Sequence, residues 1–202
     1  MNTVTLPAAW LLLIGLAPLA ALAQDFSADS VVRDPSGGIL RGKVYRASNM
    51  YRVEAVSPAA NATDPAIVIV DVASEVSYLI DDQQKIIMVS HGRAALNRIS
   101  IAVPADGDLC ARLAKSASQN ASCRSLGEDT LNGRPAVKWE MTESFNGQTA
   151  TQYVWVDPKL GAAIRVDAGR ATRELQNIQE APQPARLFAI PADYRRIDLG
   201  GR

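Results

Sequence analysis

The feature that most constrains the fold is a set of tight-turn signals between short alternating stretches. Asn-Gly pairs stand at 132–133 and 146–147, and the turn sequence "DPKLG" covers residues 157–161. The stretches between them, such as "AVKWEM" and "QYVWVD", alternate apolar and polar residues. Asn-Gly is a strong hairpin signal because the turn needs positive φ at both central residues, and alternation places the two sets of side chains on opposite faces of a strand. The chain is therefore expected to form an antiparallel sheet.

The turns also predict which side chains share a face. A two-residue turn at 146–147 sets Met141 opposite Gln152, Trp139 opposite Val154, and Val137 opposite Val156. A turn over residues 157–161 then sets Val156 opposite Ala162 and Val154 opposite Ile164. Both turns give the same apolar face: Val137, Trp139, Met141, Val154, Val156, Ala162, Ile164 and Val166. A slip of one residue would exchange the faces and bring Lys138 beside Trp155, in reach of a cation–π contact.

The first hairpin is less regular than the second. An ideal turn at Asn132 and Gly133 sends Glu128 to the apolar side, which indicates a β-bulge or a position at the end of the sheet. Earlier in the chain, the pattern predicts strands over residues 26–33, 39–46, 50–56, 67–70, 76–80 and 85–90.

A sheet with one apolar face must cover that face, and the chain offers little helix with which to do so. Residues 108–118 are the main helix candidate, with Leu109 and Leu113 on one side. The expected fold is mainly β with minor α: a single curved antiparallel sheet of about ten strands, an open half-barrel, with a short covering helix. The concave side of such a sheet can hold an apolar cavity.

The N-terminus predicts export. Residues 8–22 are apolar and uncharged, and Ala21-Leu22-Ala23 fits the small-x-small rule for signal peptidase. Residues 1–23 are accordingly assigned as a signal peptide and 24–202 as a single periplasmic domain, with an uncleaved anchor as the alternative. Nothing later is apolar for long enough to cross a bilayer. In an exported chain, Cys110 and Cys123 most simply form a disulfide, and two free buried thiols are the alternative.

Composition gives no support for nucleic-acid binding, catalysis or a metal site. Lys plus Arg and Asp plus Glu balance at 21 each, so no field of one sign spans the molecule. His91 is the one histidine and has no nucleophile beside it in sequence. Two cysteines and one histidine are too few ligands for a zinc site, and no phosphate-binding glycine loop is present. We therefore expect no catalytic residues, no cofactor and no enzyme activity.

Three segments resemble a known superfamily. The stretch "YVWVDPKLGAAIRV", residues 153–166, resembles the strand–turn–strand segment of the periplasmic lipoprotein-carrier and outer-membrane lipoprotein-sorting (LolA-like) superfamily. The stretches "CRSLGEDTLNGRPAVKWEM" and "LFAIPADYRRID" resemble related exported families of the same half-barrel type. The resemblance implies an open, unclosed antiparallel barrel covered by helices, whose best-known members hold acyl chains in the concave cavity. This chain departs from the carriers in opening on a strand at Asp25 and Phe26, where they begin with a helix.

The resemblance and the predicted face together give a functional expectation. The chain is expected to bind a lipid or a lipoprotein acyl chain in a concave cavity lined by Val137, Trp139, Met141, Val154, Val156 and Ile164. The alternative is an envelope protein-interaction or sensory domain with a filled core and no lipid ligand. A partner protein of the envelope belongs to that alternative, and an enzyme comes third.

Export is testable by mass. The protein purified from its native host should lack residues 1–23 and begin at Gln24, because Ala21-Leu22-Ala23 offers a cleavage site. Intact-mass spectrometry measures this directly. A full-length species recovered only by detergent extraction would show instead that the segment is an anchor.

Overall fold

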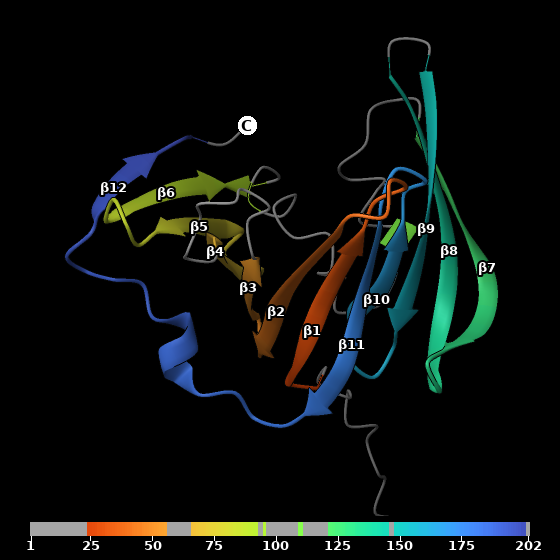
Figure 1. Ribbon diagram of the computed structural model, residues 1–202, viewed down its shortest axis with the longest axis horizontal. Helices are drawn as coiled ribbons and strands as arrows, with labels where there is room; N and C mark the ends of the chain where they lie inside the picture. Colours follow the sequence, from red (N-terminus) through yellow and green to blue (C-terminus); the bar gives the residue numbers. More distant parts are fainter. Residues whose placement is uncertain are drawn as a thin grey trace, which may run out of the picture.

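The computed structural model describes residues 24–55, 66–92, 95, 109–110, 121–145 and 148–200. Twelve strands form one curved sheet in the order β12-β6-β5-β4-β3-β2-β1-β11-β10-β9-β8-β7 (Figure 1). The strands are β1 (Phe26–Arg33), β2 (Ile39–Ala47), β3 (Met50–Ala55), β4 (Ala66–Asp71), β5 (Val76–Asp81), β6 (Ile86–His91), β7 (Ala121–Leu131), β8 (Arg134–Phe145), β9 (Gln148–Asp157), β10 (Ala162–Asp167), β11 (Thr172–Glu180) and β12 (Arg195–Asp198).

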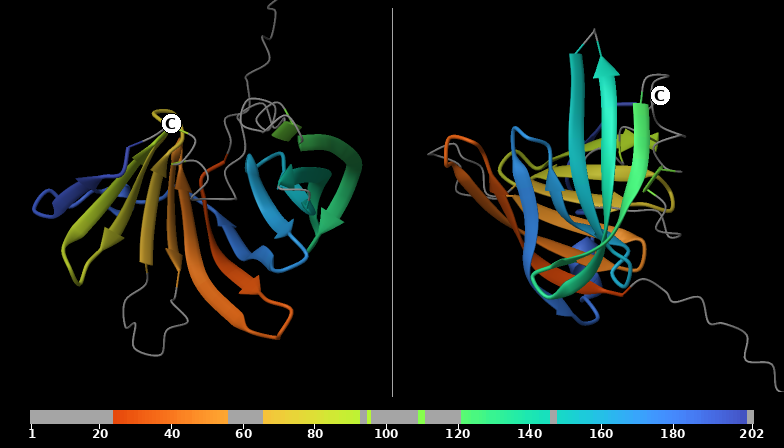
Figure 2. Two further views of the ribbon diagram at one scale, coloured as in Figure 1. Left: turned by 90° about the horizontal axis from the view of Figure 1, so that it is seen from above. Right: turned by 90° about the vertical axis from the view of Figure 1, so that its right-hand side faces the viewer.

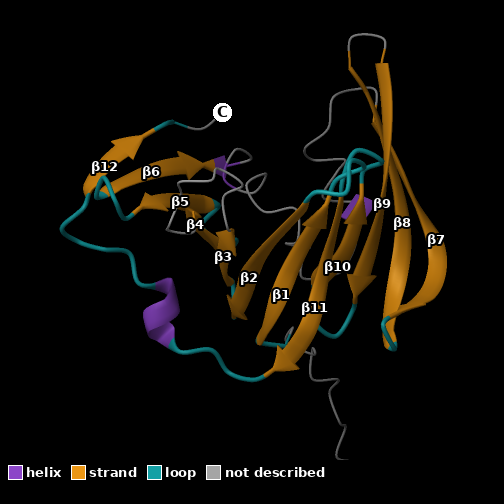
Figure 3. Ribbon diagram, viewed as in Figure 1, coloured by secondary structure: helices purple, strands orange, loops and turns teal. Residues whose placement is uncertain are grey.

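The predicted fold class is confirmed, with two differences. The sheet has twelve strands where about ten were expected, and β12 pairs with β6 in parallel while the other pairings are antiparallel. Helix is scarce in the described residues, as Figure 3 shows: η1 (Ala185–Phe188) is a single 3-10 turn. Of the predicted covering helix, Leu109 and Cys110 are helical, and the rest of residues 108–118 lies outside the described ranges.

The β7–β8 hairpin follows the sequence signals. Asn132 and Gly133 have φ of 52° and 76°, which is the positive-φ pair that an Asn-Gly turn requires. Glu128 lies opposite Val137, as an ideal turn predicts. The expected irregularity is present as a register shift between Ser125 and Gly127, where Gly127 takes a φ of 96° that glycine adopts without strain.

The register of β8 against β9 is confirmed, since Met141 pairs with Gln152, Trp139 with Val154 and Val137 with Val156. The register predicted for β9 against β10 is wrong. Ala162 pairs with Asp157, one residue after the predicted Val156, and a bulge between Ala163 and Arg165 then sets Val154 opposite Val166. The bulge inserts one residue, so the alternation expected on β10 is broken at Ile164.

Asp157 is the reason for the tighter β9–β10 turn. Its carboxylate accepts hydrogen bonds from the backbone N–H groups of Lys159 and Leu160, at 2.8 and 3.2 Å. Asp157 is only 2% exposed, and Arg134 Nε donates to its second oxygen at 2.7 Å. Arg134 also bonds Glu180, so this pair of ion pairs joins the start of β8 to the ends of β9 and β11.

The sheet is strongly curved, as Figure 2 shows. Three apolar clusters pack against it. The first contains Phe26, Ala28, Val44, Tyr51, Val70, Ala136, Leu160, Ala162, Ile164 and Leu175. The second lies on β8, β9 and β10 with Leu109 packed against it. In the third, Ile190 and Tyr194 of the C-terminal segment pack on the isoleucines of β4, β5 and β6. Arg52 of β3 supports that segment by donating to the Leu187 carbonyl at 2.9 Å.

The predicted disulfide is present. Cys110 and Cys123 are bonded, with their Cα atoms 5.3 Å apart. Cys123 lies on β7 opposite Met141 of β8, so the bond attaches the residues next to Leu109 to this end of the sheet.

Removing the disulfide should lower stability. The bond closes a loop with a sequence separation of 13. By lowering the conformational entropy of the unfolded chain, a loop of this size stabilises the folded state by about 3 kcal/mol. The double variant Cys110→Ser/Cys123→Ser should lose about that much free energy of unfolding in a urea titration. In the wild type, denatured without a reducing agent, a thiol-alkylating reagent should label neither cysteine. Labelling of both cysteines, or an unchanged urea midpoint in the variant, would contradict the expectation.

Candidate functional site

The candidate site is a continuous apolar surface on β8, β9 and β10, here called the apolar wall. Val154 and Val156 are 4% and 2% exposed and form its centre, next to Ala163 and Val166. Trp139 and Met141 pack against them and remain partly exposed. Val137 lies opposite Val156 and therefore shares this face. The wall combines a buried valine centre with two larger side chains that contact solvent.

Five of the six predicted cavity residues lie on this wall, and Ile164 does not belong to it. Ile164 packs in the first cluster, with Phe26 and Leu160. The cause is the register at the β9–β10 turn, which sets Ala163 instead of Ala162 opposite Val156. Ala162, also predicted on this face, therefore lies in the first cluster with Ile164, and the bulge then returns Val166 to the wall. Sequence reasoning also missed Ala163, which takes the place opposite Val156. The sequence placed Leu109 on the apolar side of a helix, but it did not predict that Leu109 packs on the wall.

One polar atom of the wall lacks a partner. The indole Nε1 of Trp139 is buried and makes no hydrogen bond in the part of the chain that the structure describes. A buried donor without an acceptor costs about 1–3 kcal/mol. The neighbouring Gln152 donates to the Met141 sulfur at 3.8 Å. The wall is thus hydrocarbon and sulfur with one unused N–H donor.

The opposite face of the same strands is polar, and its aromatic rings contact cationic side chains. Lys138 Nζ lies 4.7 Å from the ring centre of Trp155 and 5.0 Å from that of Tyr153, and Arg165 lies 5.2 Å from Trp155. The Trp155 indole donates to Asp129 at 2.7 Å. This hydrogen bond holds the pKa of Asp129 below its ordinary value. The cation–π contact between Lys138 and Trp155 is present, but in the predicted register, where the two residues lie opposite each other, and not through the one-residue slip from which it was expected.

The described residues show no assembled catalytic or metal-binding group. No set of three or more His, Cys, Asp or Glu in those ranges could hold a metal ion. His91 is partly exposed at the end of β6, with Nε2 3.2 Å from Asp198. The carboxylates whose pKa departs from the ordinary value are all shifted downward, for example Asp198 by a backbone N–H and His91, which keeps them ionised near neutral pH. Within the same ranges, no helix has the length and apolar character to cross a membrane.

Known proteins match this chain at the level of the fold. No family model and no curated protein matches it. A solved structure of an uncharacterized conserved protein from Thermus thermophilus matches with a TM-score of 0.50 and 15% identity, over 88% of this chain and 92% of that chain. A LolA superfamily protein from Nitrosomonas europaea matches with a TM-score of 0.40 and 11% identity, over 85% and 94% of the two chains. A putative outer membrane lipoprotein-sorting protein domain from Vibrio parahaemolyticus matches with a TM-score of 0.25 and 11% identity, over 82% and 89%.

The likeness to the Thermus protein shows a shared fold. At these identities the likeness concerns the fold alone.

The contact between Asp129 and Trp155 should titrate in acid. Because the hydrogen bond depresses the Asp129 pKa, the contact persists above the ordinary value of 3.8 and is lost as pH falls through the lower, folded-state pKa. In the chain from Gln24 carrying Trp139→Phe, Trp155 is the only tryptophan, and its emission should change with a midpoint below 3.8. Asp129→Asn should remove that transition. A midpoint at or above 3.8 would contradict the assignment.

Proposed function

We propose that this chain is an exported, non-enzymatic protein that binds a hydrophobic ligand, such as a lipid or a lipoprotein acyl chain, against the apolar wall. The observation that carries the proposal is the wall itself. Trp139 and Met141 stay partly exposed beside a buried valine centre, and Leu109 packs on the same surface. The disulfide of the adjacent Cys110 holds that cover beside Met141.

The distribution of charge favours a hydrocarbon ligand. Lys138 and Arg165 lie on the opposite face, where Trp155 and Asp129 hold them. The wall side is therefore apolar, and each methylene that an acyl chain buries there would contribute about 0.8 kcal/mol. Several methylenes on Trp139, Met141 and Val166 are enough to give measurable binding.

The Trp139 indole supplies one point of polar recognition. Its Nε1–H is buried and lacks an acceptor within the described residues. A carbonyl oxygen of an ester, amide or protonated acid can accept that hydrogen bond and remove the cost of the unpaired donor. The favoured ligand is thus an acyl group, in which a carbonyl joins a hydrocarbon chain.

Export belongs to the same proposal. The expected cleavage after residue 23 would release residues 24–202 as a single domain into the periplasm. The lipids and lipoproteins of the envelope carry the acyl chains that such a domain could bind there. The resemblance of residues 153–166 to the lipoprotein-carrier superfamily supports this location. We propose no cofactor, no metal and no nucleic-acid partner.

A second function is favoured by one specific observation. Val154 and Val156 are already almost fully buried, at 4% and 2% exposed. If the protein's own side chains cover the wall completely, the wall is part of the hydrophobic core. The chain would then act through its outer surface, as a partner-binding or sensory domain of the envelope. Acyl binding distinguishes the two functions.

Tryptophan quenching by a brominated fatty acid tests the proposal. Bromine quenches indoles at contact, and the chain from Gln24 has only Trp139 and Trp155, on opposite faces of the β8–β9 hairpin. Titration with 9,10-dibromostearic acid should quench Trp155→Phe, which retains Trp139. It should leave most of the emission of Trp139→Phe, the matched control.

A third variant tests the wall without the reporter. Val154→Gln places an amide on the valine centre and should weaken acyl binding about tenfold or more, at a cost of about 1–3 kcal/mol in stability. The urea midpoint of Val154→Gln must be compared with that of the wild type at the same temperature, to show that the variant is folded when its binding is measured. If dibromostearic acid quenches neither tryptophan of the folded protein, the wall is core and the partner-binding function takes its place.

A further inference from the structure

The chain is bound to the sheet at the residue where the expected cleavage would create its N-terminus. The backbone N–H of Gln24 donates to the Lys159 carbonyl at 3.1 Å. The Gln24 carbonyl in turn accepts a hydrogen bond from Arg46 Nη1 at 3.2 Å. Both backbone polar groups of Gln24 therefore have partners on other parts of the fold.

Asp25, the next residue, is bound in the same way. Its carboxylate accepts from the backbone N–H of Ser48, in the β2–β3 turn, at 2.8 Å. Its carbonyl accepts from the backbone N–H of Ala181, just after β11, at 3.2 Å. The first two residues after the expected cleavage site are thus docked on the β9–β10 turn, the β2–β3 turn, β2 and the end of β11.

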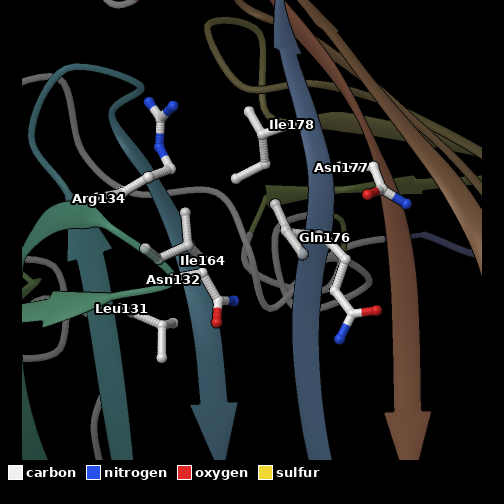
Figure 4. A pocket seen from close by; sticks show the side chains of 8 residues that line it. Leu131, Asn132, Arg134, Ile164, Gln176, Asn177 and Ile178 are labelled. Atoms are coloured by element: carbon white, nitrogen blue, oxygen red, sulfur yellow. The ribbon is translucent and has the colours of Figure 1, made fainter.

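The turn that accepts the Gln24 N–H is itself anchored. Lys159 Nζ lies 2.5 Å from one carboxylate oxygen of Glu180. Arg134, whose side chain is labelled in Figure 4, pairs with the other oxygen of Glu180 and with Asp157. The Lys159 carbonyl therefore has a fixed position, and one N–H donor at residue 24 satisfies it.

The position of Arg46 makes this place unfavourable for a second positive charge. Arg46 is 8% exposed, and its Nη1 also donates to the Leu160 carbonyl at 2.9 Å, while its guanidinium lies 5.5 Å from the Tyr51 ring centre. Within the described ranges, Arg46 forms no ion pair with a carboxylate. The backbone nitrogen and oxygen of one residue lie at most about 3.6 Å apart, so an ammonium at Gln24 would lie within about 7 Å of Arg46 Nη1. Like charges this close repel each other.

An N-terminal glutamine can lose its charge by a reaction within its own residue. The α-amine nitrogen attacks the side-chain Cδ, so that an N–Cδ bond forms and the Cδ–Nε2 bond breaks. One amine proton moves to the leaving nitrogen, and ammonia departs. The product is pyroglutamate, a neutral five-membered lactam, and no oxidant, reductant or other reactant is consumed. The Gln24 side chain is available for this reaction, because it forms no hydrogen bond with the residues that the structure describes.

The lactam matches the docking position better than the free amine does. Pyroglutamate keeps one N–H donor, and the Lys159 carbonyl is the one acceptor at the Gln24 nitrogen. It keeps the carbonyl that accepts from Arg46, and it brings no charge beside that buried guanidinium. The ring also limits the conformations of the residue in the unfolded chain, which favours the folded state.

We propose that Gln24 is a modification site: the mature chain begins with pyroglutamate, and this uncharged residue is the form in which the N-terminus docks beside Arg46 on the β9–β10 turn. The proposal rests on the proposed function in one respect, since the reaction needs the export cleavage after residue 23 to free the α-amine.

Peptide mass spectrometry of the protein from its native host tests the modification. Trypsin should release residues 24–33 as an N-terminal peptide that is lighter than its sequence mass by one ammonia. A synthetic, isotope-labelled peptide of residues 24–33 with a free Gln24 amine is added at lysis, and its conversion measures the cyclisation caused by handling. The native peptide should be almost fully cyclised while most of the labelled peptide remains linear. A linear native peptide, or equal conversion of the two, overturns the proposal and leaves export standing, whereas a first residue other than Gln24 overturns both.

Urea titration tests the docking. A chain that begins at Gln24 is released from a fusion protein by a specific protease in the cold, and half of it is cyclised with glutaminyl cyclase. The cyclised form should have an unfolding constant at least about threefold smaller at the same urea concentration, because the charge beside Arg46 is removed. The matched control carries Gln-Gly-Gly in front of Gln24, so that the cyclised residue lies outside the docking position, and its stability should not change. An equal effect in the control, or no effect in the chain that begins at Gln24, overturns the docking of pyroglutamate.

Discussion

The whole structure depends on one constraint: a single sheet has to bury its own apolar side chains. Twelve strands form one layer, and the described residues contain no second sheet and little helix: the 3-10 turn η1 and the helical residues Gly92, Ala95, Leu109 and Cys110. An apolar face in contact with water is unfavourable by about 25 cal/mol for each Å², so the layer bends until its strands cover one another. The C-terminal segment completes the cover where bending is insufficient, with Ile190 and Tyr194 on the isoleucines of the third cluster.

Bulges and turns determine how that bending is distributed. Asp157 tightens the β9–β10 turn by accepting two backbone hydrogen bonds, and Arg134 links three strand ends by its ion pairs with Asp157 and Glu180. The bulges at Ile164 and Asn177 then allow β10 to curve with β9 and β11 to curve with β1. On β10, the turn register and the bulge together place Ala162 and Ile164 in the first apolar cluster and Ala163 and Val166 on the wall. Local departures from a regular ladder therefore determine which side chains form the candidate binding surface.

The parts of the fold that depend on local chemistry could be predicted from the sequence. Asn-Gly turns specify their own dihedral angles, so the pairing of Trp139 with Val154 followed from residues 146–147 and simple alternation. The disulfide followed from two cysteines and an exported context. Ile164 was misplaced because the turn sequence does not show whether Val156 or Asp157 pairs with Ala162, and that one-residue difference decides which face Ile164 occupies. The parallel pairing of β12 with β6 could not be anticipated either, since it depends on where the C-terminal segment crosses the sheet.

The position of β1 has a consequence for the order of folding. β1 is the first strand in the chain, yet it lies in the middle of the sheet, and its Asp29 bonds Asn177, which is 148 residues later. Until β11 has emerged, β1 has a partner on one side only, and its other edge stays open to intermolecular pairing. Pairings this distant in sequence form slowly, because the loop must close before any contact compensates for the lost entropy.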